Sequence, residues 1–453
     1  MPTLAVSGGD QTAALKSTIA SLQAEALKRR SSSTLMIEDD IKISDTIEYD
    51  PALLHIRSDG RRIDASRLPQ GRPALRAHRT SKIPELSNHG RTGGFIVFGP
   101  GKGKGNTLLE LVGDDAVALV RHWWQDIVGT GFATGVTHSP NCAIYGFDRC
   151  RFVDMEVCIY GAAGLENTGE NVVYRSCTMG ASTTAIVKWM GATLRLEQCS
   201  LDYPVSGPHI ISARDPKKGG GGAVLMRGGW IESTNLKAPM VRAEGPNASV
   251  YLSDPEVFVN GAAMPKGCAV YYVDDNGHIE LDGVFHHFAA DPLDRRLAII
   301  GSKGGSFINR NPRKVFFTQN PLIRDPNNFS FPQAKNLKTQ PTVYVPVRGG
   351  VKHQDFRLEV RSSSAAGYTL KVTPMSVMSD PSNPSIYTAL KPMTPWTVGV
   401  PAGDDKTVVV DPTENTSRFV LPPQATHIAF KFEGIPAAAS KAELLPSSQF
   451  WQA

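Results

Sequence analysis

The sequence contains no apolar run approaching the ~20 residues that a membrane-spanning helix needs. Its first residues, MPTLAVSGGDQ, also lack the basic patch and the apolar core of a secretory signal. We therefore expect a protein that is made in a cytoplasm and does not insert into a membrane.

An excess of charge of one sign is missing as well. Lys and Arg number 48 against 43 Asp and Glu, a net charge of +5, which gives no reason to expect nucleic acid as a partner. The Gly-Lys stretch at residues 99–106 has neither the closing Lys-Ser/Thr of a phosphate loop nor a helical pattern after it. No dinucleotide fingerprint or Ser-His-Asp set is visible, so we expect no cofactor and no bound metal.

What the sequence does have is a pattern repeated six times. Apolar residues stand five and three positions before an anchor residue, and an apolar residue or, once, His286 stands two positions after it. Apolar and polar residues alternate within each stretch, as in a strand with one buried face. The anchors lie 27, 22, 30, 26 and 29 residues apart: Cys150, Cys177, Cys199, Gly229, Pro255 and Val284. A strand that recurs at such a period indicates a solenoid, here a right-handed parallel β-helix.

Three of the six cysteines occupy the same position in consecutive coils. Because parallel coils stack about 4.8 Å apart, Cys150, Cys177 and Cys199 should form an internal column of thiols. Free thiols pack as small hydrophobic groups, and a reducing cytoplasm disfavours disulfides. No histidine joins the column, which argues against a metal site there.

The two ends of the chain have other patterns. Asp10 can cap a helix whose apolar residues are Leu15, Ile19, Leu22 and Ala26, and this helix would cover the open edge of the first coil. Strand candidates are visible between residues 65 and 140, but they cannot be placed in register. After a Pro/Asn-rich stretch, short alternating strands separated by turns favour an antiparallel sandwich. The predicted domains are a cap helix and first strand (1–50), the β-helix (51–310), a connector (311–340) and a C-terminal β-sandwich (341–453).

Two outward columns carry charge. Two positions before the anchors stand Asp148, Arg175, Glu197 and Arg227, whose alternating signs predict an ion-pair ladder. Three positions after the anchors, Asp202 and Glu232 lie on adjacent coils, so they are our candidate catalytic residues. A pair of carboxylates suits glycoside hydrolysis, with one as proton donor and the other as base or nucleophile. The competing interpretation is that both are ordinary solvated surface residues.

Aromatic residues flank this acidic pair. Trp230 and Glu256 stand one position after their anchors on adjacent coils, and Tyr203 follows Asp202 directly. Indole and phenol rings stack on sugar faces while their polar edges stay in water. We therefore assign Trp230, Tyr203 and Glu256 to substrate binding.

The start of the chain resembles that of pectate-lyase-like β-helix proteins, especially tailspikes and tail fibres of bacteriophages. These begin with an Asp-Thr-Ala-Ala-Leu helix and a Gly-Asp-Gly-like turn before the second coil. The matching residues here are Asp10, Thr12, Ala13, Ala14 and Leu15, then Ser58, Asp59, Gly60 and Arg61. The resemblance covers roughly residues 8–305 and is more specific for the fold than for an activity.

The resemblance implies a homotrimeric virion tail protein, assembled in the host cytoplasm, that binds capsule or lipopolysaccharide during adsorption. Such proteins often degrade the polymer, and their C-terminal domains commonly hold the trimer or bind sugar. Many of them carry a particle-binding domain before the helix. None is visible here, so we expect attachment through the cap, the C-terminal domain or another phage tail protein.

Three functions remain open at this point. The chain could be a polysaccharide depolymerase, acting by hydrolysis or by β-elimination. It could instead be a non-catalytic receptor binder or structural tail component. A bacterial polysaccharide lyase or epimerase is a third alternative, which the missing secretory signal disfavours.

Overall fold

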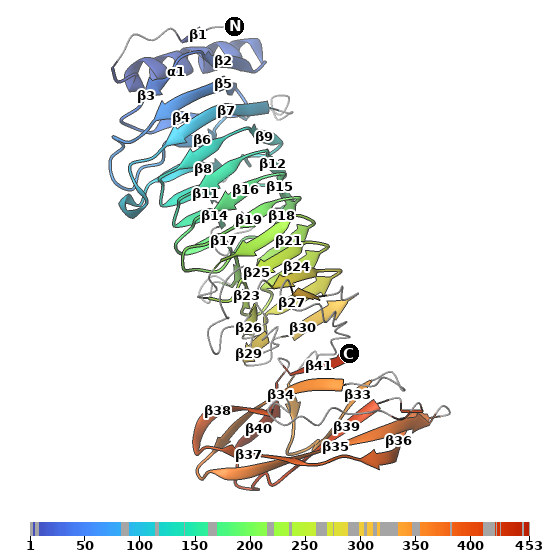
Figure 1. The fold of residues 1–453 in the computed structure, drawn as a ribbon. Helices are drawn as coiled ribbons and strands as arrows, with labels where there is room; N and C mark the ends of the chain where they lie inside the picture. Colours follow the sequence, from blue (N-terminus) through green and yellow to red (C-terminus); the bar gives the residue numbers. More distant parts are fainter. Residues whose placement is uncertain are drawn as a thin grey trace. The chain divides into compact units, whose positions relative to one another are not determined.

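A computed structural model gives the fold as two compact units, residues 1–270 and 271–453 (Figure 1). We describe each unit by itself. The residues described are 3–4, 9–82, 90–113, 117–139, 141–161, 170–214, 222–234, 238–259, 270–274, 276–288, 299–302, 306–310, 315–317, 334–346, 354–380, 383–410, 422, 424–425, 427–445 and 448–452.

The first unit begins with the predicted helix, α1 (Thr12–Arg29). Its buried residues Leu15, Ile19, Leu22 and Ala26 pack toward the first strands of the unit. Our prediction that Asp10 is the N-cap was wrong, because Gln11 occupies that position. Asp10 instead accepts hydrogen bonds from the backbone N–H (2.9 Å) and hydroxyl (2.6 Å) of Thr12, and so still orders the first turn.

Parallel strands stack behind this helix. The first coils are built from β1 (Thr3–Leu4), β2 (Ser33–Ile37), β3 (Ile41–Lys42), β5 (Leu54–Asp64) and β7 (Gly90–Phe98), with the short 3-10 helix η2 (Lys102–Lys104) after them. A second sheet contains β4 (Ile47–Tyr49), β6 (Leu75–Arg79), β8 (Thr107–Gly113), β11 (Thr134–His138), β14 (Val157–Gly161), β17 (Ala185–Trp189), β20 (Ile210–Ala213) and β23 (Val241–Glu244). Figure 1 shows these strands side by side, and the predicted β-helix is confirmed.

Each repeated stretch forms two short strands rather than the single strand that its alternation predicts. In the first unit the strands before the anchors are β12 (Tyr145–Asp148), β15 (Val172–Arg175), β18 (Thr193–Glu197), β21 (Ala223–Arg227) and β24 (Ser249–Ser253). Those after the anchors are β13 (Arg151–Val153), β16 (Thr178–Gly180), β19 (Ser200–Asp202), β22 (Trp230–Ser233) and β25 (Glu256–Val259). One coil earlier, β9 (His122–Gln125) and β10 (Val128–Thr130) pair with β12 and β13.

A left-handed residue bends the chain between the two strands of each stretch. It stands immediately before the anchor, so two outward side chains in a row separate the anchor from the buried residue three positions before it. The residues with positive φ at this position are Asp126, Arg149, Ser176, Gln198, Gly228 and Asp254, and Gly94 takes the same place within the continuous strand β7. The bend gives each coil two outward faces, one before it and one after it.

Bends at the same position also give the register of strands between residues 65 and 140, which could not be placed from the sequence. Asp126 has a φ of 54°, and Ile127 after it is buried like the other anchors. One coil earlier, Gly94 precedes the buried Phe95, and Val128 pairs with Ile96 in parallel register. The coil with β9 and β10 is therefore a regular member of the stack.

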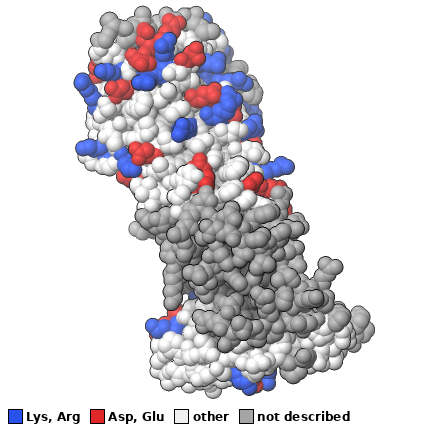
Figure 2. Space-filling view, viewed as in Figure 1, with Lys and Arg blue, Asp and Glu red and all other residues white. Residues whose placement is uncertain are grey.

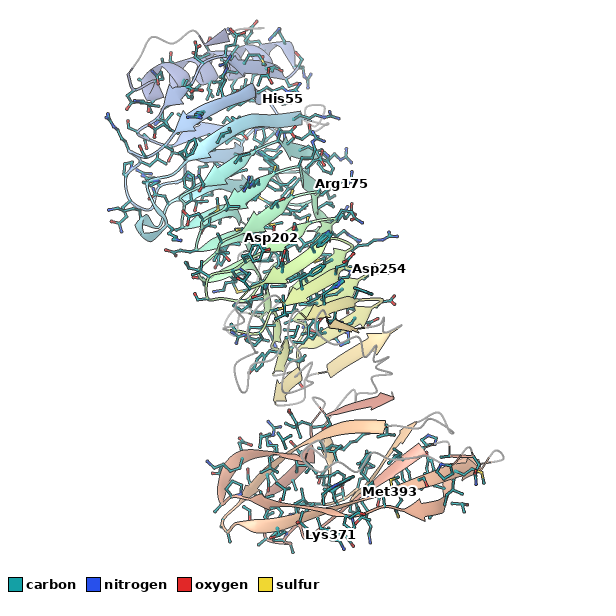
Figure 3. All side chains as sticks on the ribbon, in the orientation of Figure 1. His55, Arg175, Asp202, Asp254, Lys371 and Met393 are labelled. Atoms are coloured by element: carbon teal, nitrogen blue, oxygen red, sulfur yellow. The ribbon has the colours of Figure 1, made fainter. Side chains whose placement is uncertain are left out.

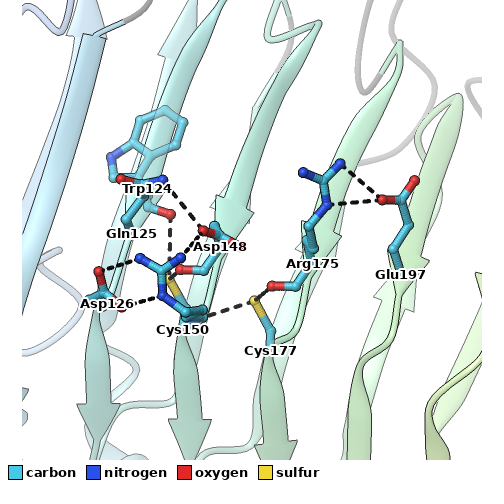
Figure 4. Close-up of polar contacts among 9 residues, drawn as sticks. Trp124, Gln125, Asp126, Asp148, Cys150, Arg175, Cys177 and Glu197 are labelled. Atoms are coloured by element: carbon cyan, nitrogen blue, oxygen red, sulfur yellow. Dashed lines mark hydrogen bonds and ion pairs between the residues drawn. The ribbon is translucent and has the colours of Figure 1, made fainter.

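The predicted column of thiols lies inside the first unit, and Figure 4 shows two of its members, Cys150 and Cys177. Cys150, Cys177 and Cys199 are buried and free, and the backbone N–H of Cys150 donates to Sγ of Cys177 at 3.4 Å. Beside the thiols, the rings of Trp124, Phe147 and Tyr174 stack with centroids 5.1 and 4.4 Å apart. Stacked columns of this kind fix the register of neighbouring coils, because a slip by one residue would expose every member.

The predicted ladder of charges is in register but is not made of pairs between all its members. Asp148, Arg175, Glu197 and Arg227 are aligned on consecutive strands. Arg175 forms an ion pair with Glu197 at 3.1 Å, whereas Asp148 pairs with Arg149 beside it in the chain at 2.6 Å (Figure 4). Arg149 can reach Asp148 because it occupies the bend. The alternation of apolar and polar residues did not predict this position.

Buried histidines make the first unit sensitive to acid. His138 is hydrogen-bonded to the hydroxyls of Tyr145 and Tyr174, the latter at 2.8 Å. Burial lowers the pKa of His138 to about 3. Burial also lowers the pKa of His209 to about 4, and its Nε2 donates to the carbonyl oxygen of Glu232 at 2.8 Å. Both imidazoles are therefore neutral in the folded unit.

We expect the free energy of unfolding to fall as the pH drops below 6.5. The unfolded chain then binds protons at these histidines and the folded unit does not, which costs about 2 kcal/mol per histidine at pH 5. Urea unfolding at pH 7.5, 6 and 5 measures this loss. His138→Gln should be less stable at pH 7.5 but should show a shallower pH dependence. An unchanged pH dependence in this variant would contradict the assignment.

The second unit starts with parallel strands and continues as a sandwich. The parallel strands are β26 (Tyr271–Asp274), β27 (His278–Asp282), β28 (Phe285–Phe288), β29 (Ile299–Ser302), β30 (Ser306–Arg310) and β31 (Val315–Phe317). His286, predicted to point inward, is buried and hydrogen-bonded to the hydroxyl of Tyr271 at 2.7 Å. The strand β31 lies within the range that we predicted as a connector, and the domain boundaries remain a prediction.

Two antiparallel sheets form the sandwich. One contains β32 (Lys335–Asn336), β34 (Gln354–Ser364), β38 (Gly403–Val410), β40 (Lys441–Leu444) and β41 (Gln449–Gln452). The other contains β33 (Thr342–Pro346), β35 (Tyr368–Asp380), β36 (Asn383–Pro392), β37 (Trp396–Val400) and β39 (His427–Glu433). Side chains from both, such as Val360 and Phe430, share one apolar core. The sequence RFVLP at residues 418–422 also has the alternation expected of a strand, but it lies almost wholly outside the described residues.

Among the described residues, no helix combines the length and the apolar character that crossing a lipid bilayer requires.

Candidate functional site

The candidate residues lie on one outward face of the first unit. We call this face the outer strip and define it by the exposed or half-buried side chains of β10, β13, β16, β19, β22 and β25, the strands that follow the bends. Between them, residues such as Phe152, Leu201 and Ile231 point inward and are fully buried. The core therefore holds the strip rigidly, which suits a site that must present several groups to one ligand.

Asp202 and Glu232 are direct neighbours on the outer strip. They are aligned in the parallel pairing of β19 with β22, so their Cα atoms lie about one strand spacing, ~4.8 Å, apart. Burial raises the pKa of Asp202, a hydrogen bond from the Ser200 hydroxyl (2.6 Å) opposes this, and the charge of Glu232 raises the pKa further. Asp202, labelled in Figure 3, thus holds a proton more readily than a fully exposed aspartate does.

Two neighbours fix the position of Glu232. The Tyr203 side chain is hydrogen-bonded to Glu232, and this bond raises the pKa of Tyr203 to about 12. The carbonyl oxygen of Glu232 accepts both the backbone N–H of Tyr203 at 2.8 Å and the Nε2–H of His209 at 2.8 Å. Tyr203 has a φ of 46°, so the chain leaves the strip directly after Asp202. This turn brings the Tyr203 ring to the acidic pair.

Trp230 provides an aromatic surface next to the pair. Its side chain is 48% exposed, and Tyr203 is 43% exposed. The Trp230 ring stacks on Phe258 with centroids 4.9 Å apart and an interplanar angle of 10°. Glu256 is aligned with Trp230 on β25, as predicted. The structure thus brings all five predicted site residues onto the strip or its edge.

Sequence reasoning missed four residues of this region: Arg151, Ser200, His209 and Phe258. Ser200 and Phe258 belong to the two columns that contain Trp230 and Glu232, so reading each column one coil further would have found them. Arg151 is two coils before Ser200 in the same column. His209 gave no signal, because it reaches the Glu232 carbonyl from the adjoining connection.

A groove of about 560 Å³ lies elsewhere in the first unit, against α1. Its lining includes Lys16, Asp45, Arg76 and Glu110, which form ion pairs with each other at 2.5 Å (Lys16–Asp45) and 2.9 Å (Arg76–Glu110). Figure 2 shows the same mixture of both signs of charge over this end of the unit. The groove contains none of the predicted site residues. The described residues include no cluster of three or more His, Cys, Asp or Glu side chains placed to hold a metal ion.

Comparison with known proteins identifies the fold. No family model and no curated protein matches the sequence. Among solved structures, the enzymatically active domain of tailspike protein 4 from bacteriophage CBA120 matches 98% of this chain and 66% of its own length, with a TM-score of 0.53 and 12% identity. Full-length tailspike protein 2 from the Escherichia coli O157:H7 bacteriophage CAB120 matches 98% of this chain and 69% of its own length, with a TM-score of 0.53 and 11% identity.

The chain therefore spans about two thirds of the length of these two proteins. At such low identity the likeness concerns the fold alone. It extends over nearly all of the chain, so it includes both the stacked coils and the C-terminal strands. The fold of this chain is that of bacteriophage tailspike proteins, a parallel β-helix with an N-terminal helix and a C-terminal antiparallel sandwich.

Proposed function

We propose that this chain is a tail protein of a bacteriophage that binds a bacterial surface polysaccharide on the outer strip and hydrolyses it. The observation that carries the proposal is the alignment of Asp202 with Glu232 beside the exposed rings of Tyr203 and Trp230. Exposed aromatic faces bind sugar rings, and a carboxylate pair cleaves the bond between them. Both requirements are met within two adjacent strands.

The roles of the two acids follow from their surroundings. Asp202, whose pKa is raised by burial, donates the proton to the leaving glycosidic oxygen. The Tyr203 side chain is hydrogen-bonded to Glu232 and so holds this carboxyl group in place, which suits a nucleophile or base. Retaining enzymes hold their carboxyl groups about 5 Å apart, close to one strand spacing, so we expect retention of the anomeric configuration.

The fold supports this proposal. One of the two solved structures with a TM-score of 0.53, tailspike protein 4 of bacteriophage CBA120, is described as an enzymatically active domain. Parallel β-helices place long rows of side chains at a fixed spacing, which suits a polymer with repeating units. We extend the proposal to a homotrimer located in the virion tail, which is the assembly that the resemblance to tailspikes implies.

Incubating the purified protein with capsular polysaccharides and lipopolysaccharides tests the proposal. We expect new reducing ends from at least one polymer, with shortening visible by size-exclusion chromatography. A rise in absorbance from unsaturated uronates would show β-elimination instead of hydrolysis. Binding without any cleavage would favour the non-catalytic receptor binder. The absence of both binding and cleavage would contradict the proposed function. Light scattering on the same sample tests the trimer.

A further inference from the structure

Arg151 is the cation of the outer strip nearest to the acidic pair along the stack. It belongs to β13, where Phe152 is buried and Arg151 is exposed. Within the part of the chain that the structure describes, no carboxylate forms an ion pair with its guanidinium group, although its charge is felt by Asp202. Arg149 at the bend and Arg175 on the other face do have carboxylate partners.

The surface between Arg151 and the acidic pair is formed by residues with small side chains. Thr178 and Ser200 follow Arg151 in its column, and Gly180 precedes Asp202 in the adjacent column. A Cβ atom at Gly180 would lie 2.4 Å from the carbonyl oxygen of Asp202, so this position excludes a side chain. A ligand lying along the strip therefore meets small groups between a cation at one end and carboxylates with aromatic rings at the other.

The charges of the strip are segregated. From β13 to β25 its outward acids are Asp202, Glu232 and Glu256, all on the last three strands, and its outward cation is Arg151. Two strand spacings, roughly 10 Å, separate the strand of Arg151 from that of Asp202. A sugar chain bound over Asp202 and Glu232 thus reaches Arg151 with a different ring from the one being cleaved.

We propose that Arg151 binds the carboxylate of an acidic sugar, so that the polymer recognised by the outer strip is an acidic polysaccharide. This inference rests on the proposed function and names its substrate class. A guanidinium group binds a carboxylate through two parallel hydrogen bonds, and the carboxylates of the strip lie on the strands β19, β22 and β25, at least two strand spacings from the strand of Arg151. A neutral polymer offers no anionic group to the guanidinium group of Arg151.

The test compares polymers and variants together. A panel of purified capsular polysaccharides and lipopolysaccharides, acidic and neutral, is first screened for binding to the wild-type protein. Each acidic polymer that binds is then converted to its carboxyl-reduced form. Affinities of wild type and Arg151→Gln are measured for both forms, with thermal unfolding as a check on folding. Arg195→Gln, which removes an exposed arginine on the other outward face, controls for the loss of one positive charge.

We expect Arg151→Gln to weaken binding of the acidic polymer about tenfold or more, while Arg195→Gln leaves it unchanged. Arg151→Lys should recover part of the loss, because it keeps the charge but not the paired hydrogen bonds. Wild type and Arg151→Gln should bind the carboxyl-reduced polymer equally. If the wild type binds only neutral polymers, or if Arg151→Gln binds the acidic polymer normally, the inference is wrong. If the wild type binds no polymer, the proposed function itself fails.

Discussion

Replacing Glu232 by Gln, or Asp202 by Asn, should lower the rate of polysaccharide cleavage at least about a hundredfold while the affinity for the polymer changes little. Both substitutions keep the size and shape of the side chain. The amide in Glu232→Gln could not act as a nucleophile or base, and the amide in Asp202→Asn could not donate a proton to the leaving oxygen. The measurement is the rate of appearance of reducing ends at saturating polymer.

The pH dependence of the rate separates the two roles. Because burial raises the pKa of Asp202, the wild-type rate should fall on the alkaline side as this carboxyl loses its proton. Asp202→Asn should abolish this alkaline limb together with most of the activity. Glu197→Gln is the matched control, because Glu197 is on the other outward face and pairs with Arg175. If both site variants cleave as fast as Glu197→Gln does, the catalytic site lies elsewhere.

Gly94→Ala should destabilise the first unit by at least about 2 kcal/mol. Gly94 has a φ of 81°, and an added Cβ would lie 2.0 Å from the carbonyl oxygen of Ser58 on the preceding coil. The substitution therefore combines an unfavourable backbone conformation with a clash against backbone, which no rotamer change can relieve. The midpoint of urea unfolding measures the effect.

Gly103→Ala is the control for this variant. Gly103 lies in η2, and an added Cβ there has no neighbour within 4 Å. Its unfolding midpoint should stay close to that of the wild type. Equal midpoints for the two alanine variants would show that the bend before Phe95 is not a constrained element of the stack.

The parallel β-helix could be predicted because its repeat depends on burial. Every coil must place apolar side chains at the same positions, so Cys150, Cys177 and Cys199 revealed the stack by their spacing. The bends were missed because residues such as Arg149 and Ser176 occupy a left-handed conformation that glycine usually marks. The coil of Ile127 was missed because His122 stands five positions before this anchor, where the other coils have an apolar residue. The bend at Asp126 shows that Ile127 is an anchor.

The candidate site was predictable only in part. Asp202, Glu232 and Trp230 could be aligned because residues at one position of successive coils are neighbours. The contact of His209 with Glu232 depends on the path of a connection between sheets, which has no repeat. The ionisation of Asp202 depends on how deeply its carboxyl is buried, and strand alternation alone does not give that depth. The β-sandwich followed from its short alternating strands.

The crystal structure of the Glu232→Gln variant with an oligosaccharide of the recognised polymer tests the central proposal most directly. We expect the sugar chain along the outer strip, with a glycosidic oxygen within hydrogen-bonding distance of the Asp202 carboxyl, about 2.6–3.2 Å, and a ring against Trp230. An oligosaccharide bound on another surface, with Asp202 and Trp230 untouched, would contradict the proposal.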